Sequence, residues 1–169
     1  MKKLTFITGG ARSGKSRFAQ KLALEHSPDP VYVATARIWD KEFQDRVDRH
    51  RHERDHRWTT MEEEKQLSRL PLAGRTAVID CVTLWITNFF SDSGYDIDAC
   101  FASFKTEIDS LLGQEAYLIV ISNEIGMGLH ADTEVGRKFT DLQGWVNQYL
   151  ASRADRVIFM ISGIPLTVK

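Results

Sequence analysis

The eight residues from Gly9 to Ser16, "GGARSGKS", satisfy the pattern G-x-x-x-x-G-K-[ST] without a mismatch. An apolar run, "LTFIT", precedes them, and a segment of helical character, "KSRFAQKLALEH", begins at Lys15. In this strand–loop–helix context, glycines let backbone N–H groups turn towards phosphate oxygens, and the helix N-terminus adds the positive end of its dipole. A chance glycine turn before a helix is the alternative, and the two flanking elements argue against it. The sequence therefore predicts a phosphate-binding loop.

Two residues of this loop have predicted chemical roles. Lys15 places a positive charge between the β- and γ-phosphates of a nucleotide, which makes it a candidate catalytic residue, and the hydroxyl of Ser16 is a candidate Mg²⁺ ligand. The loop indicates nucleotide binding strongly but is nearly silent on the reaction. The predicted nucleotide-binding residues of the loop are Gly9, Gly10, Ala11, Arg12, Ser13, Gly14, Lys15 and Ser16.

Short apolar runs alternate with longer amphipathic segments along the rest of the chain, which is typical of an α/β fold. The runs are near-continuously apolar, so we expect a mostly parallel sheet that helices cover on both faces. No repeat or linker divides the sequence, which favours a single domain over residues 1–169. The predicted strands are 4–8, 31–35, 76–80, 116–122 and 156–162. The predicted helices are about 14–27, 39–57, 82–91, 96–114 and 134–153.

Composition excludes several classes of partner. The net charge is −1, so bulk electrostatics point to neither nucleic acid nor a membrane surface. No apolar segment approaches the roughly 18 residues of a membrane span, and the first apolar run is too short for a signal peptide. Cys81 and Cys100 lack metal-binding spacing and are interpreted as buried reduced thiols. We therefore expect a cytoplasmic protein.

Polar residues end two of the predicted strands. Asp80 ends the run "AVID", where a Walker-B acid holds the Mg²⁺ water shell. The alternative is that Asp80 caps the following helix. Asn123 and Glu124 follow the fourth strand in "ISNEIGMG", at the edge of the sheet that carries ligands. For this pair, a role in the pocket and an ordinary polar strand end both remain open.

Residues 50–57, "HRHERDHR", contain a literal H-E-x-x-H from His52 to His56. Arginines crowd this pattern and no matching downstream ligand follows, so we do not expect zinc. His52 and His56 are predicted to be exposed to solvent.

His50 differs because it shares the apolar face of the predicted helix 39–57. Its neighbours Arg49 and Arg51 bring two guanidinium groups that suit phosphate oxygens and lower the imidazole pKa. Such a histidine can attack an α-phosphate and carry a nucleotidyl group, while a semi-buried structural histidine is the alternative. The residues at the helical spacing of three or four are Trp39, Phe43, Val47, His50 and Arg54.

Segments from Thr8 to Lys169 together resemble the adenosylcobinamide kinase / adenosylcobinamide-phosphate guanylyltransferase family. The segments are "TGGARSGKS", "YVATARIWDKEFQDRVDRHRHER", "WTTMEE", "VIDCVTLWITN", "SNEIGMG", "FTDLQGWVNQYLASRAD" and "ISGIPLTVK". The combination of phosphate loop, R-H-R segment and S-G-I-P terminus is far more specific than the loop alone. The chain departs from the family pattern at Trp145, usually arginine, and in "GLHADTEVG", which lacks a proline. Both departures bear on the corrinoid side or on subunit packing.

The resemblance implies a RecA-like P-loop domain, a homotrimer and two reactions. The enzyme phosphorylates adenosylcobinamide with ATP or GTP, then transfers GMP from GTP to that phosphate through a guanylylated histidine, releasing pyrophosphate. His50 falls on the nucleophile position. The resemblance adds nucleotide contacts at Ala34, Thr35, Ala36, Arg51, His52, Glu53, Arg54 and Glu62, with Asp80 as the acid on the metal side.

Two other functions remain open on the residues alone. One is a P-loop kinase of another small alcohol, in which His50 is structural. The other is a nucleotide-binding switch that works through a partner, although the chain has no guanine-reading N-K-x-D. Covalent labelling by GTP distinguishes the guanylyltransferase from both.

Overall fold

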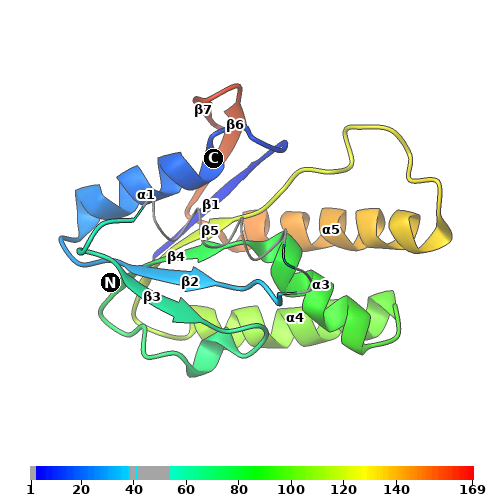
Figure 1. Ribbon diagram of the computed structural model, residues 1–169, viewed down its shortest axis with the longest axis horizontal. Coiled ribbons are helices and arrows are strands. Elements are labelled where there is room, and N and C mark those ends of the chain that lie inside the picture. The colour runs from blue at the N-terminus through cyan, green and yellow to red at the C-terminus, as the bar shows by residue number, and fades with distance from the viewer. Residues whose placement is uncertain (1–2, 39–40, 42–53) are drawn as a thin grey trace.

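The apolar runs form a seven-stranded sheet between two layers of helices in the computed structural model, which describes residues 3–38, 41 and 54–169 (Figure 1). The strands are β1 (Lys3–Gly9), β2 (Val31–Ala34), β3 (Thr59–Glu62), β4 (Thr76–Asp80), β5 (Tyr117–Ile121), β6 (Arg156–Ile161) and β7 (Ile164–Thr167). The helices are α1 (Lys15–His26), the short 3-10 helix η1 (Leu67–Arg69), α3 (Val82–Asp92), α4 (Ile97–Leu112) and α5 (Glu134–Arg153).

The strand order β3-β2-β4-β5-β1-β6-β7 determines which loops meet. The described pairings are parallel except that of β6 with β7, so the prediction of a mostly parallel sheet is confirmed. Strand β5 lies between β1 and β4. Because parallel strands end at the same edge of a sheet, the segments that follow β1, β4 and β5 come together there.

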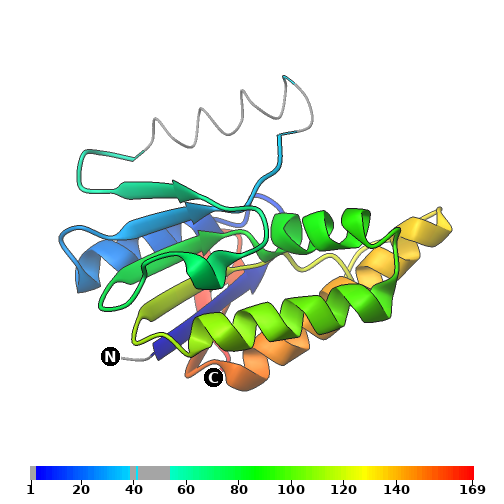
Figure 2. The same ribbon diagram turned by 90° about the horizontal axis from the view of Figure 1, so that it is seen from below.

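Alternating side chains of β1 show how the two helical layers are held. Leu4 and Phe6 face the larger core, which α3, α4 and α5 complete, whereas Ile7 faces a second core with Ala19 and Leu22 of α1. Figure 2 shows α4 and α5 side by side on the face opposite α1. Each large side chain buried in this way contributes about 1.5–3 kcal/mol. Helices therefore cover both faces, as predicted.

The prediction from sequence missed two strands and extended one helix too far. β3 and β7 have no counterpart among the predicted strands. Of the predicted helix 39–57, residues 39–40 and 42–53 lie outside the described residues, and 54–57 are not helical. The Asp55 carboxylate accepts hydrogen bonds from the Arg57 N–H and guanidinium, at 3.0 and 2.6 Å. This local turn competes with helical hydrogen bonding, so the prediction is wrong at its carboxyl end.

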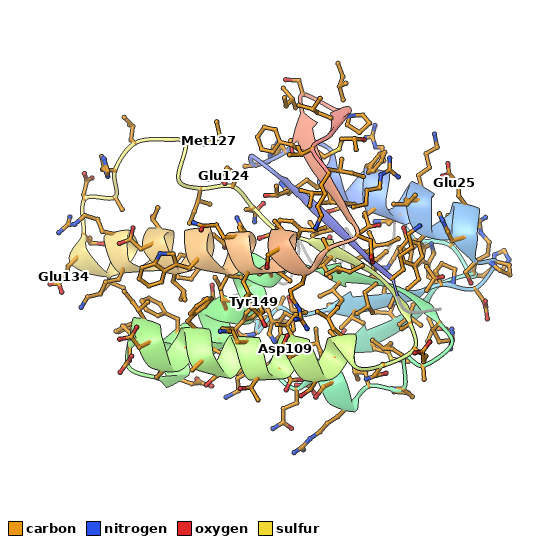
Figure 3. All side chains as sticks on the ribbon, turned by 180° about the vertical axis from the view of Figure 1, so that it is seen from behind. Glu25, Asp109, Glu124, Met127, Glu134 and Tyr149 are labelled. Atoms are coloured by element: carbon orange, nitrogen blue, oxygen red, sulfur yellow. The ribbon has the colours of Figure 1, made fainter. Side chains whose placement is uncertain are left out.

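Helix α5 begins where the long loop after β5 ends. The Thr133 side chain caps it by accepting a hydrogen bond from Gly136 N–H at 3.0 Å. Along α5, the Tyr149 hydroxyl donates to Asp109 of α4 at 2.7 Å (Figure 3). Trp145 is partly exposed and its ring lies 6.3 Å from that of Phe101, so this departure from the family pattern lies on the α4–α5 surface.

Among the described helices, none has the length and apolar character needed to cross a membrane.

Candidate active site

The phosphate loop has the backbone geometry that its glycines predict. Gly9 and Gly14 have φ values of 150° and 93°, and Arg12 has φ 55°, a region that side-chain-bearing residues rarely occupy. A Cβ on Gly9 would lie 2.6 Å from the carbonyl oxygen of Met160 in β6. Glycine at this position is therefore required by the close approach of β6 as well as by the turn.

Lys15 is held inside the loop. Its ammonium donates to the carbonyl oxygens of Gly9 and Gly10 at 3.0 and 2.6 Å, and to Ser13 Oγ at 3.5 Å. The side chain is buried, and burial lowers the pKa of the Lys15 ammonium below its ordinary value, partly offset by Cys81 and Asp80. The charge is therefore fixed at the centre of the loop.

Ser16, the second residue of α1, is hydrogen-bonded to Asp80 at the end of β4. The Ser16 hydroxyl donates to Asp80 Oδ2 at 2.7 Å, and the Tyr32 hydroxyl donates to the same oxygen at 2.8 Å. Burial, and then the charge of Asp80, raises the pKa of Tyr32 far above its ordinary value, so Tyr32 stays a neutral donor. The N-cap of α3 is Cys81, so capping by Asp80 is the wrong alternative. Asp80 instead faces the phosphate loop.

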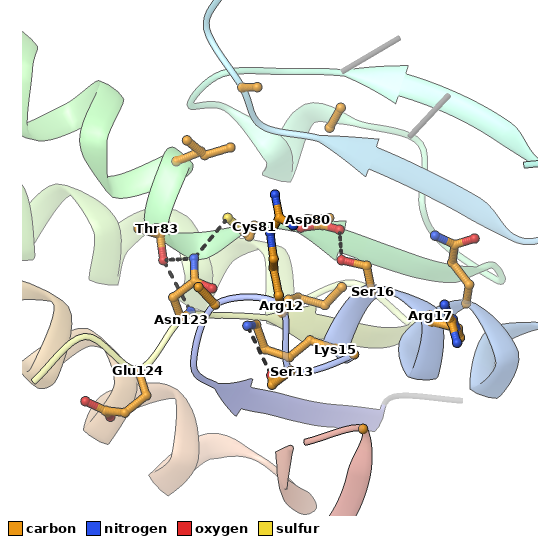
Figure 4. A pocket seen from close by; sticks show the side chains of 18 of the residues that line it. Arg12, Ser13, Lys15, Ser16, Arg17, Asp80, Cys81, Thr83, Asn123 and Glu124 are labelled. Carbon is orange, nitrogen blue, oxygen red and sulfur yellow. Dashed lines mark hydrogen bonds between the residues drawn. The ribbon is translucent and has the colours of Figure 1, made fainter. Parts of the chain in front are cut away.

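A cavity of about 1370 Å³ opens over the carboxyl ends of the central strands (Figure 4). It collects the phosphate loop, the first turns of α1, the ends of β2, β4 and β5, and the turn between β6 and β7. It is lined by residues 11–17, Gln20, Tyr32, Ala34, Ala36, Arg54, Asp80, Cys81, Thr83, Leu84, Ile121, residues 123–125, Ser162 and Gly163. This volume exceeds the roughly 300–1,000 Å³ that is usual for small-molecule sites.

The residues implied by the family resemblance separate into four groups. Ala34, Ala36 and Arg54 line the cavity, and the Arg54 guanidinium lies 3.7 Å from the Tyr32 ring centroid. Thr35 is buried instead, where its hydroxyl donates to Cys81 O at 2.8 Å and joins the segment after β2 to the one after β4. Glu62 is exposed at the end of β3 and is not among the lining residues. His50, Arg51, His52 and Glu53 lie outside the described residues.

Several residues that line the cavity were not predicted, and the contacts of three of them, Tyr32, Ser162 and Gly163, show why the site needs them. Tyr32 lies in a strand that reads as purely apolar, so nothing in the sequence distinguishes its hydroxyl. Ser162 and Gly163 form the turn between β6 and β7, and Gly163 N–H donates to Ser13 O at 3.0 Å, which braces the phosphate loop. The Ser-Gly pair between two apolar runs is a hairpin signal that could have identified this turn.

The described residues offer a small set of possible metal ligands. They contain no cluster of three or more histidine, cysteine or acidic side chains arranged to hold a metal ion. His56, the second histidine of H-E-x-x-H, is exposed as predicted. Cys81 and Cys100 are free and buried, also as predicted. The oxygens of Ser16 and Asp80 remain the pair closest to the phosphate loop.

Comparisons with known proteins agree with this geometry. The sequence profile described as cobinamide kinase / cobinamide phosphate guanyltransferase matches residues 5–168. The bifunctional adenosylcobalamin biosynthesis protein CobP of Pseudomonas aeruginosa is 38% identical over 168 residues, covering 96% of this chain and 95% of that protein. The corresponding CobU of Escherichia coli is 35% identical over 181 residues, covering 98% and 99%.

Two solved structures share the fold. They are the flagellar accessory protein FlaH of Methanocaldococcus jannaschii and an ATPase from a type III secretion system of pathogenic bacteria. Each superimposes with a TM-score of 0.51, at 16% and 13% identity, and covers 99% of this chain. The match spans 78% of the FlaH chain and 57% of the ATPase chain. At these identities the likeness concerns the fold alone, which is an α/β fold with a mostly parallel sheet.

Proposed function

The chain belongs to the cobinamide kinase / cobinamide phosphate guanyltransferase family, and from this premise we propose how its residues carry out the two transfers. The enzyme phosphorylates adenosylcobinamide with ATP or GTP. It then transfers GMP from GTP to adenosylcobinamide phosphate, giving adenosylcobinamide-GDP and pyrophosphate. The observation that carries the proposal is the phosphate loop with buried Lys15, opening into a cavity larger than is usual for small-molecule sites. One domain serves both reactions.

In the kinase step, Lys15 offsets the negative charge of the transferring γ-phosphoryl group. Its ammonium is already positioned by two carbonyl oxygens at 3.0 and 2.6 Å, so little reorganisation is needed when the phosphates bind. Residues 9–16 surround the phosphates with backbone N–H groups, and the N-terminus of α1 adds the positive end of its dipole.

Mg²⁺ accompanies the nucleotide in this proposal, with Ser16 and Asp80 as the residues that would hold it. Their side-chain oxygens lie 2.7 Å apart beside the loop, and hydroxyl and carboxylate oxygens are the hard ligands that Mg²⁺ prefers. Few protein ligands are needed because Mg²⁺ usually keeps waters and binds substrate phosphates. When bound, the ion neutralises charge on the phosphates. No zinc takes part.

In the second step, we assign the nucleophile to His50. Ala36 and Arg54, which lie before and after His50 in the sequence, both line the cavity. Arg37 anchors the end before His50 through Asp92 and Glu64, at 2.9 and 2.7 Å. Arg54 anchors the end after it on the Tyr32 ring. These anchored ends support a histidine within reach of the nucleotide.

Two displacements at the α-phosphorus then follow. An imidazole nitrogen forms a bond to phosphorus as the bond to the bridging oxygen breaks, and pyrophosphate leaves with the electron pair. The second ring nitrogen releases its proton to solvent. An oxygen of the acceptor phosphate then displaces the histidine, which regains a proton. Arg51, His52, Glu53, Arg54 and Glu62 contact the guanosine nucleotide by family resemblance.

Incubation with α-labelled GTP tests this assignment. The wild-type protein should acquire a covalent label that resists alkali and is released by acid, because a P–N bond has that stability. His50→Ala should abolish the label, whereas the control variant His56→Ala, whose side chain is exposed, should retain it. A label that survives in His50→Ala would identify the wrong histidine, and an unlabelled wild-type protein would contradict the covalent mechanism.

Assembly and location complete the proposal. The enzyme is a homotrimer in the cytoplasm. Exposed apolar side chains at β7 support an assembly, because Ile164 and Leu166 of the strand and Val168 just after it are 69%, 52% and 64% exposed. Among the described residues, β7 pairs only with β6. The two free thiols support a reducing compartment.

A further inference from the structure

Asn123 follows the strand that lies between the phosphate loop and Asp80. β5 is flanked by β1, which leads into the loop, and by β4, which ends at Asp80. The next residue, Glu124, donates its N–H to Gly9 O at 3.0 Å, and the same oxygen accepts from Lys15 Nζ at 3.0 Å. Asn123 is therefore adjacent to the ammonium that meets the γ-phosphate, on the side towards Asp80.

The carboxamide of Asn123 is held in one orientation. Its nitrogen donates to Thr83 Oγ1 at 3.1 Å and approaches Cys81 Sγ at 4.0 Å, while its backbone N–H donates to Thr83 Oγ1 at 3.3 Å. Figure 4 shows the nitrogen turned towards Thr83 and Cys81, which leaves the oxygen on the side of the phosphate loop. Asn123 also lines the cavity.

A buried polar network fixes the backbone of Asn123 from behind. Asn147 Nδ2 of α5 donates to Asn123 O at 3.1 Å, and Asn147 Oδ1 accepts from Ser122 Oγ at 2.6 Å. Gln143 Nε2 donates to both Ser122 Oγ and Asn147 Oδ1, at 2.9 and 3.0 Å. These buried hydrogen bonds connect the end of β5 to α5 and hold it in place. The result is a preorganised amide facing the cavity.

We propose that Asn123 is a catalytic residue of the kinase step, where its amide oxygen accepts a hydrogen bond from the acceptor hydroxyl and orients it for attack. This inference rests on the kinase activity proposed above. The hydroxyl oxygen forms a bond to the γ-phosphorus as the bond to the β–γ bridging oxygen breaks, and the nucleoside diphosphate leaves with the electron pair. The hydroxyl proton passes to an oxygen of the transferred phosphoryl group, so Asn123 orients the nucleophile without taking its proton.

The carboxylates of the cavity are less suited to this role. Glu124 accepts a hydrogen bond from Gly126 N–H at 2.7 Å, and Figure 4 shows its carboxylate turned away from the phosphate loop. Asp80 already accepts from Ser16 and Tyr32. Since the transition state of phosphoryl transfer is loose, orientation of the hydroxyl matters more than early removal of its proton.

Single-turnover phosphorylation of adenosylcobinamide by γ-labelled ATP tests the proposal. Asn123→Ala should slow the transfer about a hundredfold at saturating nucleotide, while the dissociation constant for ATP stays within about twofold. Thr83→Val should slow the transfer less than Asn123→Ala does, because it removes the hydrogen bond that orients the carboxamide but leaves the carboxamide in place. Thr83→Ser keeps the hydroxyl and should transfer the phosphoryl group at the wild-type rate. Met127→Ala is the matched control on the same loop, since Met127 is 79% exposed, and it should match wild type.

The outcomes separate this assignment from the proposed function. If wild type phosphorylates adenosylcobinamide and Asn123→Ala does so within about threefold of that rate, the role of Asn123 is overturned. A loss of ATP affinity equal to the loss of rate also overturns it, because the residue would then serve nucleotide binding. A wild-type protein without kinase activity would contradict the proposed function itself, and this inference with it.

Discussion

One oxygen of Asp80 joins two elements at the centre of the site. Oδ2 accepts from Ser16 of α1 and from Tyr32 of β2, so the acid is oriented before any nucleotide arrives. The sequence predicted Asp80 and Ser16 because each follows a local pattern. It could not predict Tyr32, because a tyrosine in an apolar strand has the same appearance whether or not its hydroxyl reaches a carboxylate.

Replacement of Lys15 tests the catalytic charge. Lys15→Ala should slow the kinase step by about 30- to 900-fold, which corresponds to the roughly 2–4 kcal/mol typical of one electrostatic contact to a transition state. Steady-state phosphorylation of adenosylcobinamide measures this. Lys21→Ala is the control, because Lys21 lies on the exposed face of α1 and pairs with Glu25. Turnover of Lys15→Ala within a few-fold of wild type would refute the assignment of the loop.

The buried thiols predict a loss of stability in alkali. Burial raises the pKa of Cys81 and of Cys100 to about 12, from an ordinary value of 9.0. The charge of Asp80 adds to this effect at Cys81, and the charge of Asp96 adds to it at Cys100. Between these values the folded state binds more protons than the unfolded state, so the free energy of unfolding falls as pH rises. Denaturant unfolding across this range should show a shallower fall in Cys81→Ala/Cys100→Ala. Equal slopes in both proteins would contradict these shifts.

At the scale of elements, the phosphate loop is braced by the β6–β7 hairpin. Gly163 N–H bonds to Ser13 O, and β6 approaches Gly9 closely. β7 was missed because it is a four-residue strand without a buried residue and contains Pro165, and β3 because its side chains are largely polar. Both are edge strands, which need no continuous apolar run. The central strands and helices were predictable because burial on both sides leaves a strong apolar pattern.

A pair of glycine variants tests how tightly the loop is packed. Gly9→Ala should lower the free energy of unfolding by about 1–3 kcal/mol, since its Cβ would lie 2.6 Å from a backbone oxygen that cannot move freely. Gly10→Ala is the matched control, because a Cβ there meets nothing within 4 Å, and its change should stay within about 0.5 kcal/mol. Equal stabilities for the two variants, measured by denaturant unfolding, would rule out this packing.

At the scale of the whole molecule, the strand order brings together residues that are far apart in the sequence. Ser16, Asp80, Asn123 and Gly163 meet at one cavity because β1, β4, β5 and β6 end near one edge. Local patterns predicted that ligands bind at this edge. The role of Asn123 stayed open and that of Gly163 was not predicted. Both roles depend on which strands are neighbours in the sheet, and local sequence patterns do not give that order.

The proposed homotrimer predicts the mass of the protein in solution. Light scattering should give a mass of about three times 19.3 kDa for wild type. Leu166→Asp should shift the mass towards one chain, because a charge replaces an apolar contact on the open strand, while the circular dichroism spectrum stays unchanged. A wild-type mass of one chain would contradict the trimer.

The central claim is that one protein performs both transfers in sequence. The most direct test supplies adenosylcobinamide first with γ-labelled ATP alone until it is fully phosphorylated, and then, after the ATP is removed, with α-labelled GTP, using two distinguishable phosphorus isotopes. The corrinoid product should carry both labels in equal amounts, because the acceptor phosphate comes from ATP and the GMP phosphate from GTP. A product that carries only the ATP label would leave a kinase without guanylyltransferase activity, and a product without either label would contradict the account entirely.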